Sequence, residues 1–343
     1  MRAVVLTGTG GPEVLQVQER PDPVAGPGEV RIAVRAAGIN FADTMARVGL
    51  YPDAPKTPCV LGYEVAGEIE SVGEGVSAIA PGDRVMAGTR FGGQAELAVV
   101  PAGQVLPLPD RLSFEQGAAF PVNYGTAYAA LILMGGLRES DRLLIHAAAG
   151  GVGIAATQIG RNVGAEIFGT ASPGKHDAIR AQGVTHAIDY RSQDFEAETM
   201  RITGGEGVDL VIDAIGPASF RKDYRLLRSG GRMVMFGLSE ASVSGARSIP
   251  TAVKSLLAMP LATMPWWKSL SLMNENKGIF GLNMLSWWDR EGNLDRVTAP
   301  LLADLEAARI DPVVAEAFPF DRAGDAHEFI AQRRNVGKVV LLP

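Results

Sequence analysis

The chain has 343 residues, of which 47% are hydrophobic and 20% charged, so it is long enough for two domains with separate cores. Its net charge of −6 gives no general attraction to nucleic acid or to an anionic membrane, and we expect no nucleic-acid partner. The single cysteine, Cys59, excludes an intramolecular disulfide and suits a reducing compartment.

The amino-terminal sequence MRAVVLTGTGG has the pattern of a strand that enters a turn. It lacks the basic start, apolar run and cleavage site of a signal peptide. No uninterrupted apolar stretch reaches about 20 residues, the length that a membrane-spanning helix needs. We therefore expect a cytoplasmic protein without stable membrane insertion.

The first third of the chain alternates β-rich segments with glycine and proline turns. The segments VRIAVRAAGI, VAGEIESVG, GDRVMAG and AELAVV are predicted strands, and Gly26-Pro27-Gly28 is one of the turns. This pattern predicts a compact, mainly β domain that begins with residues 1–121.

From about residue 122 the pattern changes to strands that alternate with helices. A first strand at 143–147 precedes a glycine turn and a helix to about Val163, and a further helix is predicted near 175–182. Such alternation is typical of a parallel sheet with helices on both faces. The fold class is therefore α/β, with a six-stranded, doubly wound Rossmann domain over residues 122–287. Its strands are predicted at 143–147, 165–170, 186–190, 208–214, 232–237 and 278–284.

The carboxy-terminal part returns to β structure. A helix is predicted from about Asp289 to Arg309, then the segment AEAFPF, a helix near 321–333 and the apolar strand GKVVLLP. This closing strand fits better in the first domain than on a sheet that is already complete. The β domain is thus expected to be discontinuous, with residues 1–121 and 288–343 on either side of the Rossmann domain, and a cleft between domains is the expected active site.

The sequence LLIHAAAGGVG, residues 143–153, predicts a dinucleotide-binding turn. It has the pattern A-x-G-x-x-G, and Gly150, Gly151, Val152 and Gly153 are the candidate binding residues. Glycines let the backbone approach a pyrophosphate at the positive end of the following helix. A tight strand–helix connection without a ligand is the alternative, but the position before a helix in a six-strand alternation favours binding.

The end of the second strand favours NADPH over NADH. An NAD site needs an acidic residue there to bind the ribose 2′-hydroxyl, whereas residues 169–175 read GTASPGK and contain no carboxylate. A 2′-phosphate needs donors and positive charge. Thr170, Ser172 and Lys175 supply them, and Tyr190 ends the third strand nearby.

Together these motifs resemble a known family. The sequences HAAAGGVG (146–153), S-x-x-K (172–175), DYR (189–191) and GINFADTMARVGLYP (38–52) are similar to the zinc-independent quinone oxidoreductase branch of the medium-chain dehydrogenase/reductase superfamily. The tail RRNVGKVVLLP and the segment WW…NxNKGIFGLNM are most similar to its VAT-1-like subgroup. The resemblance runs over the whole chain and implies that the β domain is a GroES-like catalytic domain.

The resemblance also implies NADPH as cofactor, a homodimer through strand 278–284, and hydride transfer to quinone-like or α,β-unsaturated carbonyl substrates. It implies that Asn40 stands beside the reacting ring. Met45 departs from the family pattern, because some quinone reductases have a tyrosine there. Further cofactor contacts are implied at Thr126, Gly216, Gly237, Leu238 and Asn335.

We expect no zinc site. Zinc dehydrogenases of this superfamily hold the metal with thiolate and imidazole ligands, but this chain has one cysteine and four histidines. Gly62-Tyr63-Glu64 stands where those enzymes have Gly-His-Glu, and Cys59 is interpreted as a small buried hydrophobic residue.

Without a metal, hydride transfer must rely on proximity, orientation and an electrophilic substrate. Tyr51 is the candidate donor of a hydrogen bond or a proton to the substrate oxygen, with water as the alternative source of the proton. Asn40 and Tyr63 are further polar candidates. Asp43 is expected to orient its loop or to pair with Arg47.

Two alternative functions, and the role of one apolar segment, are left open by the sequence. A 2-enoyl-thioester reductase is the enzymatic alternative, and a non-catalytic NADPH-binding adaptor of the VAT-1-like type is the other. The apolar segment SLLAMPLATMPWWKSLSLM, residues 255–273, is interpreted as a cover on the sheet, with a substrate lid, a dimer surface and membrane contact as alternatives.

Overall fold

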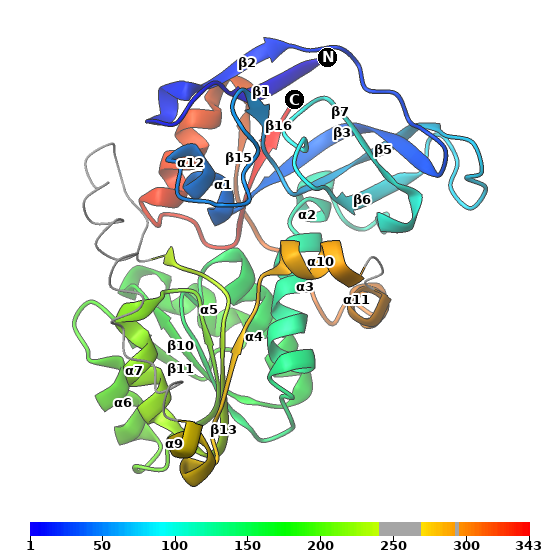
Figure 1. The fold of residues 1–343 in the computed structure, drawn as a ribbon. Helices are drawn as coiled ribbons and strands as arrows, with labels where there is room; N and C mark the ends of the chain where they lie inside the picture. Colours follow the sequence, from blue (N-terminus) through cyan, green and yellow to red (C-terminus); the bar gives the residue numbers. More distant parts are fainter. Residues whose placement is uncertain (240–268, 292–294) are drawn as a thin grey trace. The chain divides into compact units, whose positions relative to one another are not determined.

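The computed structural model describes residues 1–239, 269–291 and 295–343. Within these ranges the chain forms two compact units (Figure 1). The first contains residues 1–123 and 311–343, and the second contains the described residues from 124 to 310. The two tryptophans at 266 and 267, and most of the apolar segment 255–273, lie outside the described residues.

The second unit is built on a six-stranded parallel sheet with the order β11-β10-β9-β12-β13-β14. This order confirms the predicted doubly wound Rossmann fold, because the first strand lies in the middle and the chain winds outward from it in both directions. The strands are β9 (Arg142–Ile145), β10 (Glu166–Ala171), β11 (His186–Asp189), β12 (Val208–Asp213), β13 (Leu227–Met235) and β14 (Gly278–Gly281).

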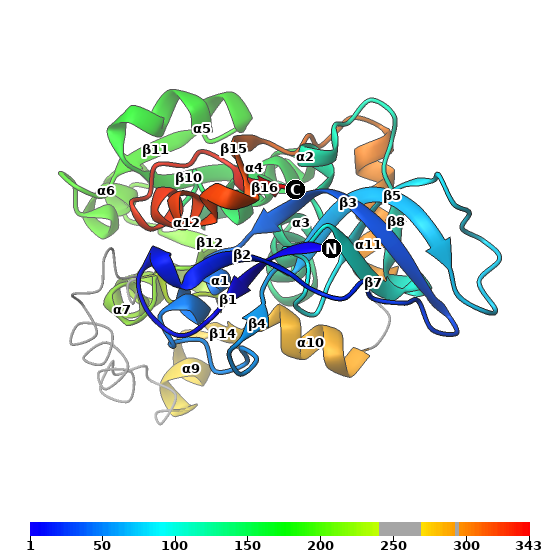
Figure 2. The same ribbon diagram turned by 90° about the horizontal axis from the view of Figure 1, so that it is seen from above.

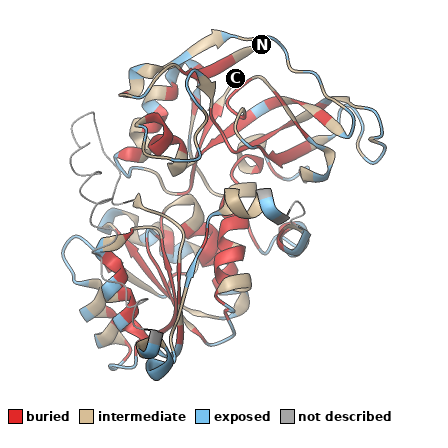
Figure 3. Cartoon of the chain, in the orientation of Figure 1, coloured by how far each residue is buried: buried red, intermediate tan, exposed pale blue. Residues whose placement is uncertain are grey.

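Helices cover both faces of this sheet because its side chains alternate (Figures 1 and 3). Gly160 of helix α4 packs on Leu143 and Ile167, whereas Leu144 and Phe168 belong to a core shared with helices α6 and α7. The helices are α3 (Pro121–Tyr128), the π-helix η3 (Ala129–Met134), α4 (Gly151–Val163), η4 (Pro173–Lys175), α5 (His176–Gln182), α6 (Phe195–Ile202), α7 (Pro217–Leu226), α9 (Ser269–Glu275), α10 (Met284–Glu291) and α11 (Asp295–Glu306).

The first unit contains two sheets, as expected for a mainly β domain. Strand β3 is central to the larger one: along one edge it pairs with β7 and then with β16, and along the other with β5 (Figure 2). The pairing of β16 with β3 shows that the carboxy-terminal strand joins the amino-terminal β unit. The strands are β1 (Arg2–Leu6), β2 (Leu15–Glu19), β3 (Glu29–Ile39), β4 (Cys59–Val60), β5 (Glu64–Val72), β6 (Arg84–Gly88), β7 (Leu97–Pro101), β8 (Val105–Pro107), β15 (Val314–Pro319) and β16 (Lys338–Leu342).

Short helices cover the sheets of this unit. The apolar side of α12, including Ala323 and Ala326, packs into the core formed by β3, β5 and β16. The helical elements are η1 (Pro12–Val14), α1 (Phe41–Arg47), η2 (Ala102–Gln104), α2 (Phe114–Gly117), η7 (Phe320–Arg322) and α12 (Ala323–Ala331).

The structure differs from the sequence prediction after β14. The strand ends at Gly281 rather than at 284, because the side chain of Asn283 accepts a hydrogen bond from Ser286 N at 3.2 Å and caps α10. The predicted helix 289–309 is replaced by α10 and α11. Both helices belong to the second unit, so the units divide after Ile310 and not after residue 287.

Packing explains this later division. Val297 and Leu301 of α11 are buried, and Asn162 of α4 donates a hydrogen bond to Arg309 O at 3.1 Å. These contacts join α11 to the Rossmann helices.

Among the described residues, no helix combines the length and apolar character that crossing a membrane requires.

Candidate active site

The glycine turn lies between β9 and α4, as the sequence predicts. Gly150 N donates to Ala147 O at 2.8 Å, and α4 begins at Gly151. A Cβ atom on Gly153 would stand 2.4 Å from Ala147 O, so only glycine fits there. With Val152, these residues present the amino end of a 13-residue helix, whose free N–H groups and dipole attract an anion.

The end of β10 carries a polar group without a carboxylate. The Thr170 side chain is buried at the end of the strand. The half-buried Ser172 precedes η4, and the half-buried Lys175 is its last residue. Tyr190, at the end of β11, is 38% exposed. Asp189, which pairs with Ala171 in the sheet register, accepts hydrogen bonds from Ser192 Oγ at 2.5 Å and Arg191 N at 3.0 Å within its own turn.

Three candidate cofactor residues meet beyond β12 and β13. A Cβ atom on Gly216, which has a φ of +117°, would lie 3.3 Å from Leu238 Cδ2. A Cβ atom on Gly237 would lie 3.0 Å from Ala214 O. The two backbones thus approach closely because neither residue has a side chain. Thr126 is 7% exposed on α3 of the same unit.

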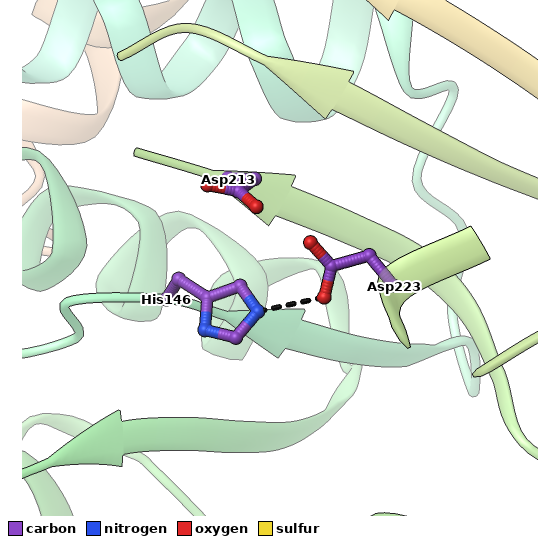
Figure 4. A group of neighbouring side chains, drawn as sticks. All are labelled: His146, Asp213 and Asp223. Atoms are coloured by element: carbon purple, nitrogen blue, oxygen red, sulfur yellow. Dashed lines mark hydrogen bonds and ion pairs between the residues drawn. The ribbon is translucent and has the colours of Figure 1, made fainter. Parts of the chain in front are cut away.

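A buried polar group beneath the glycine turn was not predicted as a site. His146 Nε2 lies 2.8 Å from Asp223 Oδ1, and the Asp223 carboxylate stands between His146 and Asp213 (Figure 4). Burial lowers the pKa of His146, but the Asp223 carboxylate more than compensates and raises it to about 9. Burial raises the pKa of Asp223 itself to about 8. The group therefore retains at least one proton at neutral pH.

These three side chains each offer one potential metal-ligand atom, and the three atoms lie within 4.8 Å of one another. Hydrogen bonds already occupy most of their polar atoms. Asp213 accepts from Gly216 N at 3.1 Å, from Ile215 N and from Ser219 Oγ, and both ring nitrogens of His146 are bonded. We therefore interpret the group as a hydrogen-bonded chain.

In the first unit, Asn40 joins a second buried polar group. Lys338 Nζ donates to Asn40 Oδ1 at 2.7 Å and to Glu64 Oε1, and Asn40 Nδ2 donates to Glu64 Oε1 at 3.1 Å. Glu64 Oε2 accepts from Val122 N at 2.8 Å. Glu64 is fully buried and Lys338 is 3% exposed. The amide of Asn40 is thus held by a charged pair.

Asp43 fixes the backbone beside two candidate catalytic residues. Its carboxylate accepts hydrogen bonds from Asn40 N at 2.7 Å and from Gly62 N, next to Tyr63, at 3.1 Å. It therefore orients its loop, as expected. The alternative pairing with Arg47 is wrong, because Arg47 Nη2 bonds Glu328 Oε1 at 3.3 Å.

The titration of Asp43 gives a testable pH dependence. Burial raises the pKa of this carboxyl to about 7, although its hydrogen bonds from Asn40 and Gly62 oppose the shift. The folded protein therefore binds more protons than the unfolded chain between about pH 4 and pH 7, so Asp43 makes stability fall as the pH rises through that window.

The substitution Asp43→Asn should remove this fall. We expect this from urea titrations at pH 4.5 to 8. The free energy of unfolding of the variant minus that of the wild type should increase up to about pH 7 and stay constant above it. Curves that stay parallel over the whole range would show that Asp43 is ionised throughout.

Tyr51 and Tyr63 lie beside each other. Their ring centroids are 6.2 Å apart with an edge-to-face angle of 78°, and Phe91 packs on Tyr63 at 5.0 Å. The buried Tyr63 hydroxyl has no hydrogen-bond partner among the described residues. Burial raises the pKa of both phenols, so both stay protonated and able to donate.

Met45 and Asn335 complete the predicted set in this unit. Met45 is buried on α1, and Asn335 precedes β16, where its Nδ2 donates to Gly337 O at 2.9 Å. Cys59 is half-buried. Asn40, Tyr51, Tyr63 and Asn335 thus belong to the first unit, and the other candidates belong to the second.

Similarity to known proteins decides the family. The synaptic vesicle membrane protein VAT-1 homolog of Rattus norvegicus is 39% identical over 352 residues, which cover 100% of this chain and 84% of that protein. The chain belongs to the VAT-1 homolog family. Two domain profiles agree with this VAT-1 family assignment: an alcohol dehydrogenase GroES-like domain matches residues 26–110, and a zinc-binding dehydrogenase matches residues 182–341.

Solved structures extend the similarity to enzymes. Escherichia coli quinone oxidoreductase complexed with NADPH has a TM-score of 0.85 and 30% identity, with 100% of both chains covered. CurK enoyl reductase has a TM-score of 0.84 and 27% identity, covering 99% of this chain and 98% of that one. This VAT-1 family member is therefore an oxidoreductase of the medium-chain dehydrogenase/reductase superfamily, with the fold that binds a nicotinamide cofactor.

Proposed function

We propose that the protein is an NADPH-dependent, zinc-independent reductase of quinone-like or α,β-unsaturated carbonyl substrates. The observation that carries this proposal is the segment after β10, where Ser172 and Lys175 offer a hydroxyl group and positive charge and no carboxylate. The buried Thr170 hydroxyl is already bonded to His146 and Ala147. The similarity to a quinone oxidoreductase complexed with NADPH supports it.

The residues present fit this cofactor. Gly153 leaves a cradle at the amino end of α4 that a Cβ atom would fill, and Gly216 and Gly237 allow close backbone approach beyond the sheet. Bound NADPH would supply a hydride. Gly150, Gly151 and Val152 would hold the diphosphate, and Ser172, Lys175 and Tyr190 the 2′-phosphate. Thr126, Leu238 and Asn335 are the proposed contacts toward the nicotinamide.

The first unit supplies donors for the substrate oxygen. The Tyr63 hydroxyl is buried, protonated and unpaired among the described residues, so a carbonyl oxygen would satisfy it. Tyr51 is the second donor and the proposed source of a proton. Asn40 is held in place by Glu64 and Lys338. Such donors stabilise the charge that a quinone or enone oxygen gains.

Steady-state oxidation of NADPH and NADH against a panel of quinones, enones and 2-enoyl-thioesters tests the proposal. We expect turnover of quinones or enones with a clear preference for NADPH. Turnover with NADH alone, or turnover confined to saturated aldehydes, would contradict it.

The similarity to CurK enoyl reductase favours one alternative substrate class, the 2-enoyl-thioesters. These share the enone electrophile, so the same donors would serve them. Faster turnover of thioesters than of quinones would support this alternative.

The second alternative is a non-catalytic, NADPH-binding adaptor, which the similarity to VAT-1 homologs keeps open. Tight NADPH binding without any turnover would support it.

The substitution Lys175→Ala should separate the two nicotinamide cofactors. Loss of one charge-assisted contact to the 2′-phosphate should raise the KM for NADPH about tenfold and leave the KM for NADH unchanged. Lys222→Ala is the matched control, because Lys222 pairs with Asp194 on the surface of the same unit. An equal rise in KM for both cofactors would show that Lys175 does not bind the 2′-phosphate.

We also propose a homodimer that forms through the segment 278–284. Its strand β14 ends the six-stranded sheet, and Phe280 on that strand is 40% exposed. An edge strand can pair with a second copy of itself. Light scattering should give twice the mass of one chain, and Phe280→Lys should shift the protein toward the monomer.

A further inference from the structure

A chain of buried hydrogen bonds links helix α7 to the glycine turn. Asp223 Oδ1 lies 2.8 Å from His146 Nε2, and His146 Nδ1 lies 3.1 Å from Thr170 Oγ1. Thr170 Oγ1 also accepts a hydrogen bond from Ala147 N at 3.3 Å. Asp223, His146 and Thr170 are each at most 3% exposed, so water cannot substitute for these contacts.

This series of hydrogen bonds ends at Ala147, a strained residue of the turn. Ala147 has a φ of +51°, a left-handed conformation that is uncommon for residues other than glycine. Its carbonyl oxygen accepts from Gly150 N at 2.8 Å and is the atom that leaves no room for a Cβ on Gly153. The conformation of Ala147 therefore sets the backbone position of both glycines at the start of α4.

The same buried group reaches a second turn. Asp213 faces the other side of the Asp223 carboxylate (Figure 4), and it accepts hydrogen bonds from Gly216 N and Ser219 Oγ at the start of α7. The Oδ2 atom of Asp223 has no hydrogen-bond partner in the described part of the chain. Asp223 thus lies beside both His146, which leads to the turn after β9, and Asp213, which holds the turn after β12.

We propose that Asp223 and His146 are positioning residues for dinucleotide binding, which hold the glycine turn in its binding conformation through the hydroxyl of Thr170. This inference rests on the proposed cofactor site and adds two residues that contact the turn rather than the cofactor. The glycine turn holds the diphosphate, which NADPH and NADH share. Breaking this series of hydrogen bonds must therefore lower the affinities for NADPH and NADH by the same factor, whereas loss of Lys175 should lower the affinity for NADPH alone.

Dissociation constants for NADPH and NADH, measured by calorimetry, test the inference in Asp223→Ala, Thr170→Val and the double variant. Each single variant should bind both cofactors about tenfold more weakly, the effect of one lost buried hydrogen bond. The double variant should bind no more weakly than the weaker single variant, because both changes break one chain. Thr170→Ser keeps the hydroxyl and should retain wild-type affinity.

Asp209→Ala is the matched control. Asp209 is a buried aspartate of the same unit at the opposite end of β12, where it accepts from Arg142 N at 2.9 Å. This variant should lose thermal stability without a change in either dissociation constant.

Three outcomes would overturn the inference: unchanged affinities in Asp223→Ala, a loss confined to NADPH, or additive losses in the double variant. If Asp223→Ala does not fold, a change of less than twofold in Thr170→Val would overturn it. A wild-type protein that binds neither cofactor would instead contradict the proposed function, so the two failures are distinguishable.

Discussion

The substitution Lys338→Met should lower the free energy of unfolding by about 3–5 kcal/mol, the usual cost of breaking a buried ion pair from one side. Lys338 is 3% exposed and its partner Glu64 is fully buried. Without the ammonium group, the Glu64 carboxylate keeps, among the described residues, only the hydrogen bonds from Asn40 Nδ2 and Val122 N. The loss should appear in urea unfolding of the first unit.

The double variant Lys338→Met/Glu64→Gln is the control for this prediction. It removes both charges, so it should recover a large part of the stability that Lys338→Met loses. A loss below about 1 kcal/mol in the single variant would show that the pair behaves like an exposed salt bridge. Both variants should also turn over more slowly, because Asn40 Oδ1 loses the ammonium group that donates to it.

The substitution Gly153→Ala should abolish measurable cofactor binding. Its Cβ would stand 2.4 Å from Ala147 O and 2.7 Å from the backbone of Ala148, and none of these atoms can move without a shift of the turn. Because the start of α4 would have to shift away from β9, we expect the affinity for NADPH to fall at least about a hundredfold, or about 2.7 kcal/mol. Calorimetric titration measures this loss.

Gly103→Ala is the matched control, since a Cβ atom on Gly103 would meet nothing within 4 Å. It should leave NADPH affinity and the midpoint of thermal unfolding unchanged. A Gly153→Ala variant that binds NADPH within threefold of the wild type would show that the turn is not the diphosphate site.

Local patterns were enough to predict the Rossmann sheet and its glycine turn. Apolar segments that alternate with helices predicted all six strands. The closing strand at 337–343 was assigned to the β unit because the Rossmann sheet was complete without it, and it pairs there with β3. The boundary near residue 288 was less predictable. Whether α10 and α11 pack on one unit or the other depends on tertiary contacts such as that of Asn162 with Arg309.

The polar groups that hold the candidate site were not predictable in the same way. Lys338 and Glu64 are 274 residues apart in sequence, and His146 and Asp223 are 77 residues apart. No spacing rule connects such positions; only the fold brings them together. A signal was nonetheless present for His146, because a histidine that ends an apolar strand must find a buried partner.

The most direct test of the central claim follows the hydride itself. The protein is incubated with NADPH deuterated at the transferable C4 position and an α,β-unsaturated ketone, and the product is examined by mass spectrometry. We predict one deuterium at the carbon β to the carbonyl, with much less product from equally labelled NADH. An unlabelled product, or no product in the presence of bound NADPH, would contradict the assignment of this protein as an NADPH-dependent reductase.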